Sequence, residues 1–233
     1  VVKIAVETHM HLHEVFCLHR YKYEKPDVSI HKKKRKYGFL NCFALLYPTV
    51  TRKEEVEQKF DTLDWRILNW IRRKLKCPFL DFLMPKITML GSAGMIWLIA
   101  AAALLCTKRY RTDGVLILAG LTLASFVGQF LLKHIIRRQR PCKVNEGVEL
   151  IVKHPKDTSF PSCHTLTSVV SATILASASP VFGSIAIPIA ALIAFSRLYL
   201  YVHYPSDVIS AAAIGVVLGE VVFRVAAAMQ FSI

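Results

Sequence analysis

Five long apolar runs in the later part of the 233-residue chain constrain its fold more than any other feature. A helix needs about 20 apolar residues to cross the roughly 30 Å hydrocarbon layer of a bilayer. Because backbone polar groups in lipid must be satisfied within the protein, such runs cross as helices. The runs are Ile87–Cys106, Val115–Leu132, Thr165–Ser179, Val181–Val202 and Val208–Ala228. The sequence therefore predicts an all-α fold, a polytopic transmembrane helical bundle with about five spans. The third run is short and needs flanking residues to reach across.

The segment 60–86 has the pattern of a helix that lies in a membrane surface. Apolar residues recur there at helical spacing between arginines and lysines, and Trp65 and Trp70 are types common at the interface. A soluble helix packed on a core is the alternative, but an apolar run follows at once. We expect an amphipathic interfacial helix at the start of a membrane domain over 60–233.

Residues 1–59 form a basic N-terminal extension of unknown role. Within it His9, His11 and His13 alternate, so an extended chain would present all three on one face. A metal site needs a defined set of ligands, and no carboxylate or cysteine completes one here. A polar loop is the simpler interpretation, and we expect neither a metal nor another cofactor.

The formal net charge of +14 indicates anionic partners. Nucleic acid, anionic lipid headgroups and phosphate-bearing substrates all fit this charge. The apolar runs favour the lipids, because a protein that binds nucleic acid has no use for them. We therefore expect the lipid bilayer and a membrane lipid phosphate as partners, and no nucleic acid.

Three polar stretches stand at the ends of predicted spans. The second span ends in Lys133–Pro141, the third begins after Ser159–His164, and the fourth continues into Ser196–Asp207. Successive span ends alternate between the two faces of a membrane, so all three stretches lie on the same face. They bring lysine, arginine, histidine and aspartate side chains into one layer.

These side chains suit phosphoryl transfer, which depends mostly on positioning and on neutralising charge on the phosphate oxygens. Lys133, Arg140 and Arg197 can supply that charge. Pro161 and Ser162 resemble the start of a helix, where free N–H groups bind anions. Of two histidines, one can attack phosphorus while the other protonates the departing oxygen.

Asp207 lies four residues after His203, close enough to accept its second ring N–H. That contact fixes the tautomer and makes the other ring nitrogen a better nucleophile. The first two stretches each have an ordinary explanation, since basic residues commonly flank membrane helices and a histidine such as His164 can be an interfacial polar residue. The third is harder to dismiss, because Arg197 near a span end is costly without a partner. The three stretches together are far more specific than any one of them.

The spacing resembles that of the type 2 phosphatidic acid phosphatase (PAP2) superfamily, and in particular its small bacterial membrane lipid phosphatases, over about residues 60–228. The family pattern is Lys-x6-Arg-Pro, then Pro-Ser-Gly-His, then Ser-Arg-x5-His-x3-Asp. The first and third motifs are complete, and the second has Cys163 in place of glycine. The other matching residues are Lys133, Arg140, Pro141, Pro161, Ser162, His164, Ser196, Arg197, His203 and Asp207.

The resemblance implies a role for most of these residues. His203 is the nucleophile that forms a phosphohistidine, Asp207 orients it, and His164 acts as general acid and then as base for water. The residues implied to hold the phosphate are Lys133, Arg140, Ser162, Cys163 and Arg197. No metal is implied. Two interpretations of the cysteine stay open: it affects the pocket, or it packs as a small apolar group.

We therefore predict an integral-membrane lipid phosphatase of a bacterial plasma membrane. Its substrate would be a lipid phosphomonoester or pyrophosphate of the phosphatidic acid, phosphatidylglycerol phosphate or undecaprenyl pyrophosphate class, cleaved without a metal. One alternative is a catalytically weak lipid-binding or scaffold protein of the same fold, which Cys163 motivates. Another is a transporter or channel, which Glu220 within a span motivates. The sequence leaves the lipid and the oligomeric state open.

The loop between the first two spans predicts the orientation. It is short and contains Lys108, Arg109 and Arg111, which places it in the cytoplasm by the positive-inside rule. The three polar stretches then lie on the extracytoplasmic face. An odd number of spans also puts the basic N-terminal segment outside, against the same rule. We favour the extracytoplasmic site because many of those charges have phosphate or membrane-surface contacts to make.

Overall fold

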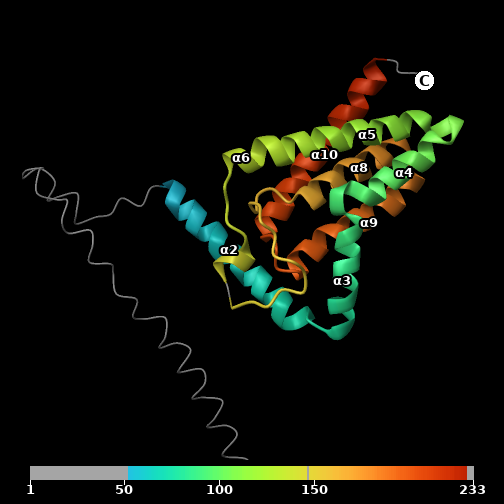
Figure 1. Cartoon of the computed structure of the whole chain (residues 1–233). Helices are drawn as coiled ribbons and strands as arrows, with labels where there is room; N and C mark the ends of the chain where they lie inside the picture. Colours follow the sequence, from blue (N-terminus) through green and yellow to red (C-terminus); the bar gives the residue numbers. More distant parts are fainter. Residues whose placement is uncertain (1–51, 146, 230–233) are drawn as a thin grey trace, which may run out of the picture. The chain divides into compact units, whose positions relative to one another are not determined.

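The computed structural model describes residues 52–145 and 147–229 (Figure 1). Every regular element in these ranges is a helix, which confirms the all-α prediction. In chain order they are α2 (Arg52–Leu75), α3 (Pro78–Leu90), η2 (Ser92–Gly94), α4 (Met95–Leu105), η3 (Lys108–Tyr110), α5 (Arg111–Ser125), η4 (Phe126–Leu132), α6 (Lys133–Ile135), α7 (Pro141–Val144), α8 (Cys163–Ala178), α9 (Pro180–Tyr199) and α10 (Pro205–Ala228). Residues 1–51, with the three alternating histidines, lie outside the described part. α2 begins upstream of residue 60, so the domain boundary stays a prediction.

The long apolar helices confirm the predicted transmembrane bundle. The continuous helix over Lys108–Ile135, α9 and α10 are each long and apolar enough to cross a membrane. The predicted first span, Ile87–Cys106, covers the last turn of α3 and Ser92–Leu105. The whole of α3 and Ser92–Leu105 pass together as one span but bend by 50° at a break. The helix over 108–135 contains the π-helical turn η4 immediately before Lys133. Such turns are frequent at functional sites.

The bend between α3 and α4 has a backbone cause. Ala93 and Gly94 have positive φ angles of 51° and 70°, a conformation that a continuing helix does not contain. Gly91 precedes them at a close contact: a Cβ there would stand 2.7 Å from Ile193 Cγ2 and 3.2 Å from His164 Cδ2. Glycine at this position therefore lets the bend pack against α8 and α9.

α8 is the central helix, packed against α5, α9 and α10 (Figure 1). Its 16 residues rise about 24 Å, less than the hydrocarbon layer, so the predicted third span is indeed the short one. Gly215 on α10 allows the two helices to pack closely. A Cβ at that position would lie 2.8 Å from Val169 Cβ on α8, too close for a normal contact. The neighbouring helices surround α8, and Val170 and Ile174 are fully buried.

The predicted surface helix over 60–86 is divided in the structure. α2 ends at Leu75, Cys77 is extended, and Pro78 opens α3. Proline disfavours a helical residue before it and suits the first turn of a new helix, so this break has a signal in the sequence. α2 is amphipathic as predicted: Leu68 is buried in the bundle, whereas Trp70 is exposed.

Large apolar side chains on the outer faces of the spans are exposed, as expected for surfaces that contact lipid. Among them are Ile99, Phe130, Ile185, Ile209 and Val217. The ionisable residue within the last span has polar partners: the Glu220 carboxylate accepts hydrogen bonds from Ser177 Oγ at 3.1 Å and from Arg224 Nε at 2.9 Å. These contacts give Glu220 a structural explanation that requires no transport pathway.

Candidate active site

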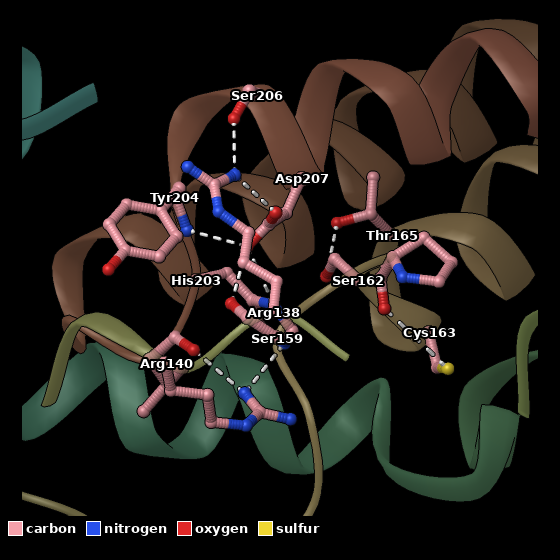
Figure 2. Close-up of polar contacts among 12 residues, drawn as sticks. Arg138, Arg140, Ser159, Ser162, Cys163, Thr165, His203, Tyr204, Ser206 and Asp207 are labelled. Atoms are coloured by element: carbon pink, nitrogen blue, oxygen red, sulfur yellow. Dashed lines mark hydrogen bonds and ion pairs between the residues drawn. The ribbon is translucent and has the colours of Figure 1, made fainter. Parts of the chain in front are cut away.

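Residues from the three polar stretches, among them Arg140, Ser162 and His203, come together in the structure (Figure 2). Each residue that the sequence predicted for the site lies at a helix end or in a connection between helices. Lys133 begins α6, and Arg140 and Ser162 come directly before α7 and α8. Cys163 and His164 begin α8, Arg197 lies in the last turn of α9, His203 lies between α9 and α10, and Asp207 lies in the first turn of α10. Residues far apart in the sequence thus line one region.

His203 is buried in the tight connection between α9 and α10. The preceding Tyr201 has a positive φ of 59°, and its hydroxyl donates to Asn69 Oδ1 on α2 at 3.2 Å. Arg140 Nη1 lies 2.9 Å from His203 Nε2. Because arginine only donates hydrogen bonds, Nε2 is the unprotonated ring nitrogen and Nδ1 carries the hydrogen.

The Nδ1 atom of His203 faces Asp207. It lies 3.6 Å from Asp207 Oδ2, slightly beyond hydrogen-bond distance. Burial, together with the charges of Arg140 and Arg197, lowers the pKa of His203 to about 3, although Asp207 acts in the opposite direction. The imidazole is therefore neutral at physiological pH, with a free lone pair on Nε2.

Asp207 is held by three donors besides its contact with His203 (Figure 2). Oδ1 accepts from Arg138 Nη1 at 2.8 Å. Oδ2 accepts from Ser159 Oγ at 2.5 Å and from the backbone N–H of Tyr204 at 3.0 Å. A carboxylate with this many donors stays ionised and fixed in place.

Arg138 connects Asp207 to α2, a contact that the sequence did not predict. Its Nη2 donates to Asp64 Oδ2 at 2.7 Å, and its guanidinium lies 3.9 Å from the centroid of the Tyr204 ring. Asp64 is buried and also accepts from the backbone N–H of Ser206 at 2.9 Å. The start of α10, which carries Asp207, is therefore fastened to α2.

Lys133 and Arg140 share a second residue that sequence reasoning missed, Asp157 in the loop before α8. The Lys133 ammonium forms an ion pair with Asp157 Oδ2, and Arg140 Nη2 donates to Oδ1 at 2.8 Å. Burial raises the pKa of Asp157, but hydrogen bonds and charge from the two cations outweigh this and lower it to about 2. Asp157 belongs to none of the three motifs, so no spacing signal pointed to it.

Arg197 is a buried cation with few partners. Its Nη1 donates to Thr88 Oγ1 on α3 at 2.5 Å, while the buried Nε has no hydrogen-bond partner among the described residues. A buried guanidinium with an unpaired donor is costly unless an anion pairs with it. Arg197 is thus suited to bind an anionic group.

The start of α8 adds backbone donors. Ser162 precedes the helix, and no side chain caps its first turn, so the free N–H groups there favour an anion. Ser162 Oγ accepts from Thr165 Oγ1 at 2.9 Å. Cys163 is already helical, and its thiol points away from His203 and Arg140 (Figure 2); a Cβ at Gly128 would lie 3.4 Å from its Sγ. The family glycine is therefore not needed here for an unusual backbone conformation.

His164 faces the same region from the first turn of α8. Its Nε2 lies 3.3 Å from Ser92 Oγ, at the break between α3 and α4. The ring is within electrostatic range of Arg197, His203, Arg140 and Lys133. The two histidines therefore belong to one site. No group of three or more His, Cys, Asp and Glu side chains that could hold a metal occurs in the described part of the chain.

A helical membrane bundle with two histidines and a cluster of cations at one end has the groups that phosphoryl transfer to and from a membrane lipid requires. The chain belongs to the PAP2 superfamily, whose family model matches residues 113–230. The match confirms the resemblance found in the sequence motifs. It does not include α2 and α3, which supply Asp64 and Thr88.

Curated relatives are lipid phosphatases by name. The chain is 32% identical over 124 residues to an undecaprenyl-diphosphatase of Sulfolobus acidocaldarius, a match that covers 52% of this chain and 58% of the relative. It is 31% identical over 137 residues to a decaprenylphosphoryl-5-phosphoribose phosphatase of Mycobacterium tuberculosis, covering 58% of this chain and 73% of the relative.

Two crystal structures have a similar fold. LpxE of Aquifex aeolicus aligns with a TM-score of 0.62 and 26% identity, over 70% of this chain and 95% of its own. A PAP2-type phosphatidylglycerolphosphate phosphatase of Bacillus subtilis aligns with a TM-score of 0.59 and 26% identity, over 82% of this chain and 94% of its own. The chain is thus an integral membrane protein of a family of lipid phosphatases.

Proposed function

We propose that this protein hydrolyses the terminal phosphate or pyrophosphate of a membrane lipid through a phosphohistidine intermediate. The observation that carries the proposal is the buried, neutral His203, whose Nε2 faces Arg140 while its Nδ1 faces Asp207. The names of the relatives favour polyprenyl phosphates or diphosphates as the first substrates to test. Phosphatidic acid and phosphatidylglycerol phosphate are the other classes.

In the first step the phosphate lies among Lys133, Arg140 and Arg197, with the N–H groups of the α8 N-terminus, including that of Cys163, on its oxygens. Arg140 Nη1 moves from His203 Nε2 to a phosphate oxygen. Nε2 then attacks phosphorus, forming an N–P bond as the P–O bond to the lipid breaks. Asp207 stabilises the positive imidazole through Nδ1–H, and His164 gives a proton to the departing oxygen.

In the second step a water molecule takes the place of the lipid. His164, now without its proton, acts as the base that activates the water. The water oxygen bonds to phosphorus, the N–P bond breaks, and the electron pair returns to His203 Nε2. Inorganic phosphate then leaves. The three cations and the backbone donors neutralise charge throughout, so the proposed mechanism uses no metal.

Phosphate release by the purified protein tests the proposed function. The panel is undecaprenyl diphosphate, undecaprenyl phosphate, phosphatidic acid and phosphatidylglycerol phosphate in mixed micelles. We expect turnover of at least one lipid, unchanged activity in excess chelator, and inhibition by orthovanadate, which resembles the transferring phosphoryl group. Binding without turnover of any lipid would favour the scaffold alternative, and activity lost in chelator and restored by magnesium would contradict the metal-free mechanism.

We also propose that the site faces the extracytoplasmic side of a bacterial plasma membrane. Cys106 is exposed next to the basic loop at the opposite end of the bundle from the site, and Lys156 is exposed on the loop beside the site. The test uses two variants that each keep one cysteine: Cys106 in the first, and the cysteine introduced by Lys156→Cys in the second. A membrane-impermeant thiol reagent is expected to label the second variant in intact cells and the first only after permeabilisation. The reverse pattern would place the site in the cytoplasm.

A further inference from the structure

The Asp157 carboxylate occupies the cation pair that the proposed mechanism assigns to phosphate. Its two oxygens are divided between Lys133 and Arg140, as two oxygens of a bound phosphate would be. The side chain of Lys133 is 9% exposed and that of Arg140 is 3% exposed, whereas that of Asp157 is 46% exposed. The cations are therefore the buried part of this cluster, and the carboxylate is the part that can turn toward solvent.

The backbone around Asp157 is tied to the segment that carries both arginines. Arg140 Nε donates to the carbonyl oxygen of Asp157 at 3.2 Å. Lys143 Nζ donates to the carbonyl oxygen of Lys156 at 2.9 Å. The backbone N–H of Ser159 donates to the carbonyl oxygen of Arg138 at 2.8 Å. These bonds keep the carboxylate near the cations at a high effective concentration, so any ligand of the two cations must displace it.

We propose that Asp157 is a specificity-determining residue, an internal anion that keeps phosphodiester headgroups out of the site and yields to terminal phosphates and pyrophosphates. This inference rests on the proposed function. Ordinary phospholipids carry a phosphodiester and surround the protein at high concentration, so the site must reject them. The Asp157 carboxylate, which belongs to the same chain as the cations, can exclude phosphodiesters from the site without a separate binding pocket for them.

Charge decides which ligand displaces the carboxylate. A phosphodiester carries one negative charge, the same as the Asp157 side chain, and gains nothing over a tethered carboxylate. A phosphomonoester carries about −1.5 to −2 at pH 7, and a pyrophosphate more, so its attraction to Lys133, Arg140 and Arg197 is stronger. The lowered pKa of Asp157, about 2, means that it stays ionised at physiological pH and keeps this role.

The displacement also prepares the nucleophile. Arg140 donates to the Asp157 carboxylate through Nη2 and to the Asp157 backbone carbonyl through Nε. Its Nη1 contacts both the Val202 carbonyl oxygen and His203 Nε2. When a dianionic phosphate takes the place of the carboxylate at Nη2, it also lies beside Nη1 and competes with the lone pair of His203 Nε2 for that donor. A ligand that fails to displace Asp157 leaves His203 covered.

The test compares Asp157→Asn with Glu149→Gln in the purified protein. Both variants remove one carboxylate charge, and Glu149 is exposed in the same loop but outside the site. Calorimetric titration with inorganic phosphate is expected to show about tenfold tighter binding to Asp157→Asn and parent-like binding to Glu149→Gln. Phosphatidylglycerol in mixed micelles is expected to compete with phosphate in Asp157→Asn but not in the parent. Asp157→Ala serves as a second variant if the asparagine variant is poorly folded.

Two results would overturn the inference. One is phosphate binding in both Asp157 variants that equals or falls below that of the parent. The other is tighter phosphate binding without competition by phosphatidylglycerol, which would leave Asp157 no part in selectivity. Because these measurements record binding, they are independent of turnover. A protein that binds phosphate in this pattern but hydrolyses no lipid would contradict the proposed function and leave the inference standing.

Discussion

His203→Ala is expected to lower kcat by a factor on the order of 10⁴ or more, the scale at which enzymes lose activity when a nucleophile is removed. The expected loss is large because no other group stands where His203 Nε2 stands. The atom lies 2.9 Å from Arg140 Nη1, and its ring is held by burial and by the neighbouring Asp207. Water admitted by the substitution would be a far weaker nucleophile.

The covalent intermediate gives this prediction a second readout. Acid- and base-quenched reactions with radiolabelled substrate are expected to trap base-stable, acid-labile phosphate on the parent and none on His203→Ala. The low pKa of His203, about 3, means that the nucleophile stays unprotonated as the pH falls from 8 to 5. Loss of labelling across that range is therefore not expected from protonation of His203.

His154→Ala is the matched control for His203→Ala. His154 is an exposed histidine in the loop before α8, so its removal tests whether any histidine near the site affects turnover. We expect parent-like kcat and normal phosphate trapping in that variant. Near-normal turnover in His203→Ala, or trapping that persists in it, would exclude His203 as the nucleophile.

The bundle could be predicted from the sequence because hydropathy and length decide whether a segment crosses a membrane. The break in the first span could not, since Ala93 and Gly94 adopt positive φ within an apolar run whose hydropathy is continuous. The division between α2 and α3 did have a signal, Pro78, but the apolar periodicity on both sides of it obscured that signal. The spacing of apolar residues shows which face of a helix is apolar, but it does not show where one helix ends and the next begins in a new direction.

The motif residues could be placed together from span alternation alone, but their partners could not. Arg137 and Arg138 are neighbours of the same type, yet Arg137 is exposed while Arg138 joins Asp64 to Asp207. The two arginines differ only because the backbone after α6 directs one side chain toward solvent and the other toward α2 and α10. Asp157 is similar, since its position opposite Lys133 follows from loop packing that no local pattern encodes.

Two contacts outside the family match tie the site to the helices before it. Asp64 on α2 holds Arg138, and Thr88 on α3 accepts a hydrogen bond from Arg197. The part of the chain that matches the family contains the proposed reacting groups, and these two helices hold Arg138 and Arg197. The proposed catalytic geometry therefore depends on Asp64 from the predicted surface helix and Thr88 from the predicted first span, neither of which belongs to a motif.

His164→Ala is expected to separate the two steps of the reaction. Loss of a general acid costs about 10²- to 10⁴-fold, and the loss applies to a lipid whose departing oxygen needs a proton. A nitrophenyl phosphate releases a stable phenolate without that proton, so its first step is expected to remain fast. Its second step still needs a base for water, which the variant lacks.

The expected result for His164→Ala with nitrophenyl phosphate is therefore a burst of nitrophenolate followed by slow turnover, with phosphate accumulating on His203. Rapid-mixing absorbance measures the burst, and trapping of labelled phosphate measures the intermediate. Both roles rest on the place of His164 in the PAP2 motif and in the first turn of α8, where its Nε2 lies 3.3 Å from Ser92 Oγ. His203→Ala provides the comparison, because it is expected to show no burst with either substrate. If His164→Ala slows the lipid and the nitrophenyl substrate equally, and without a burst, then His164 positions the phosphate and does not transfer protons.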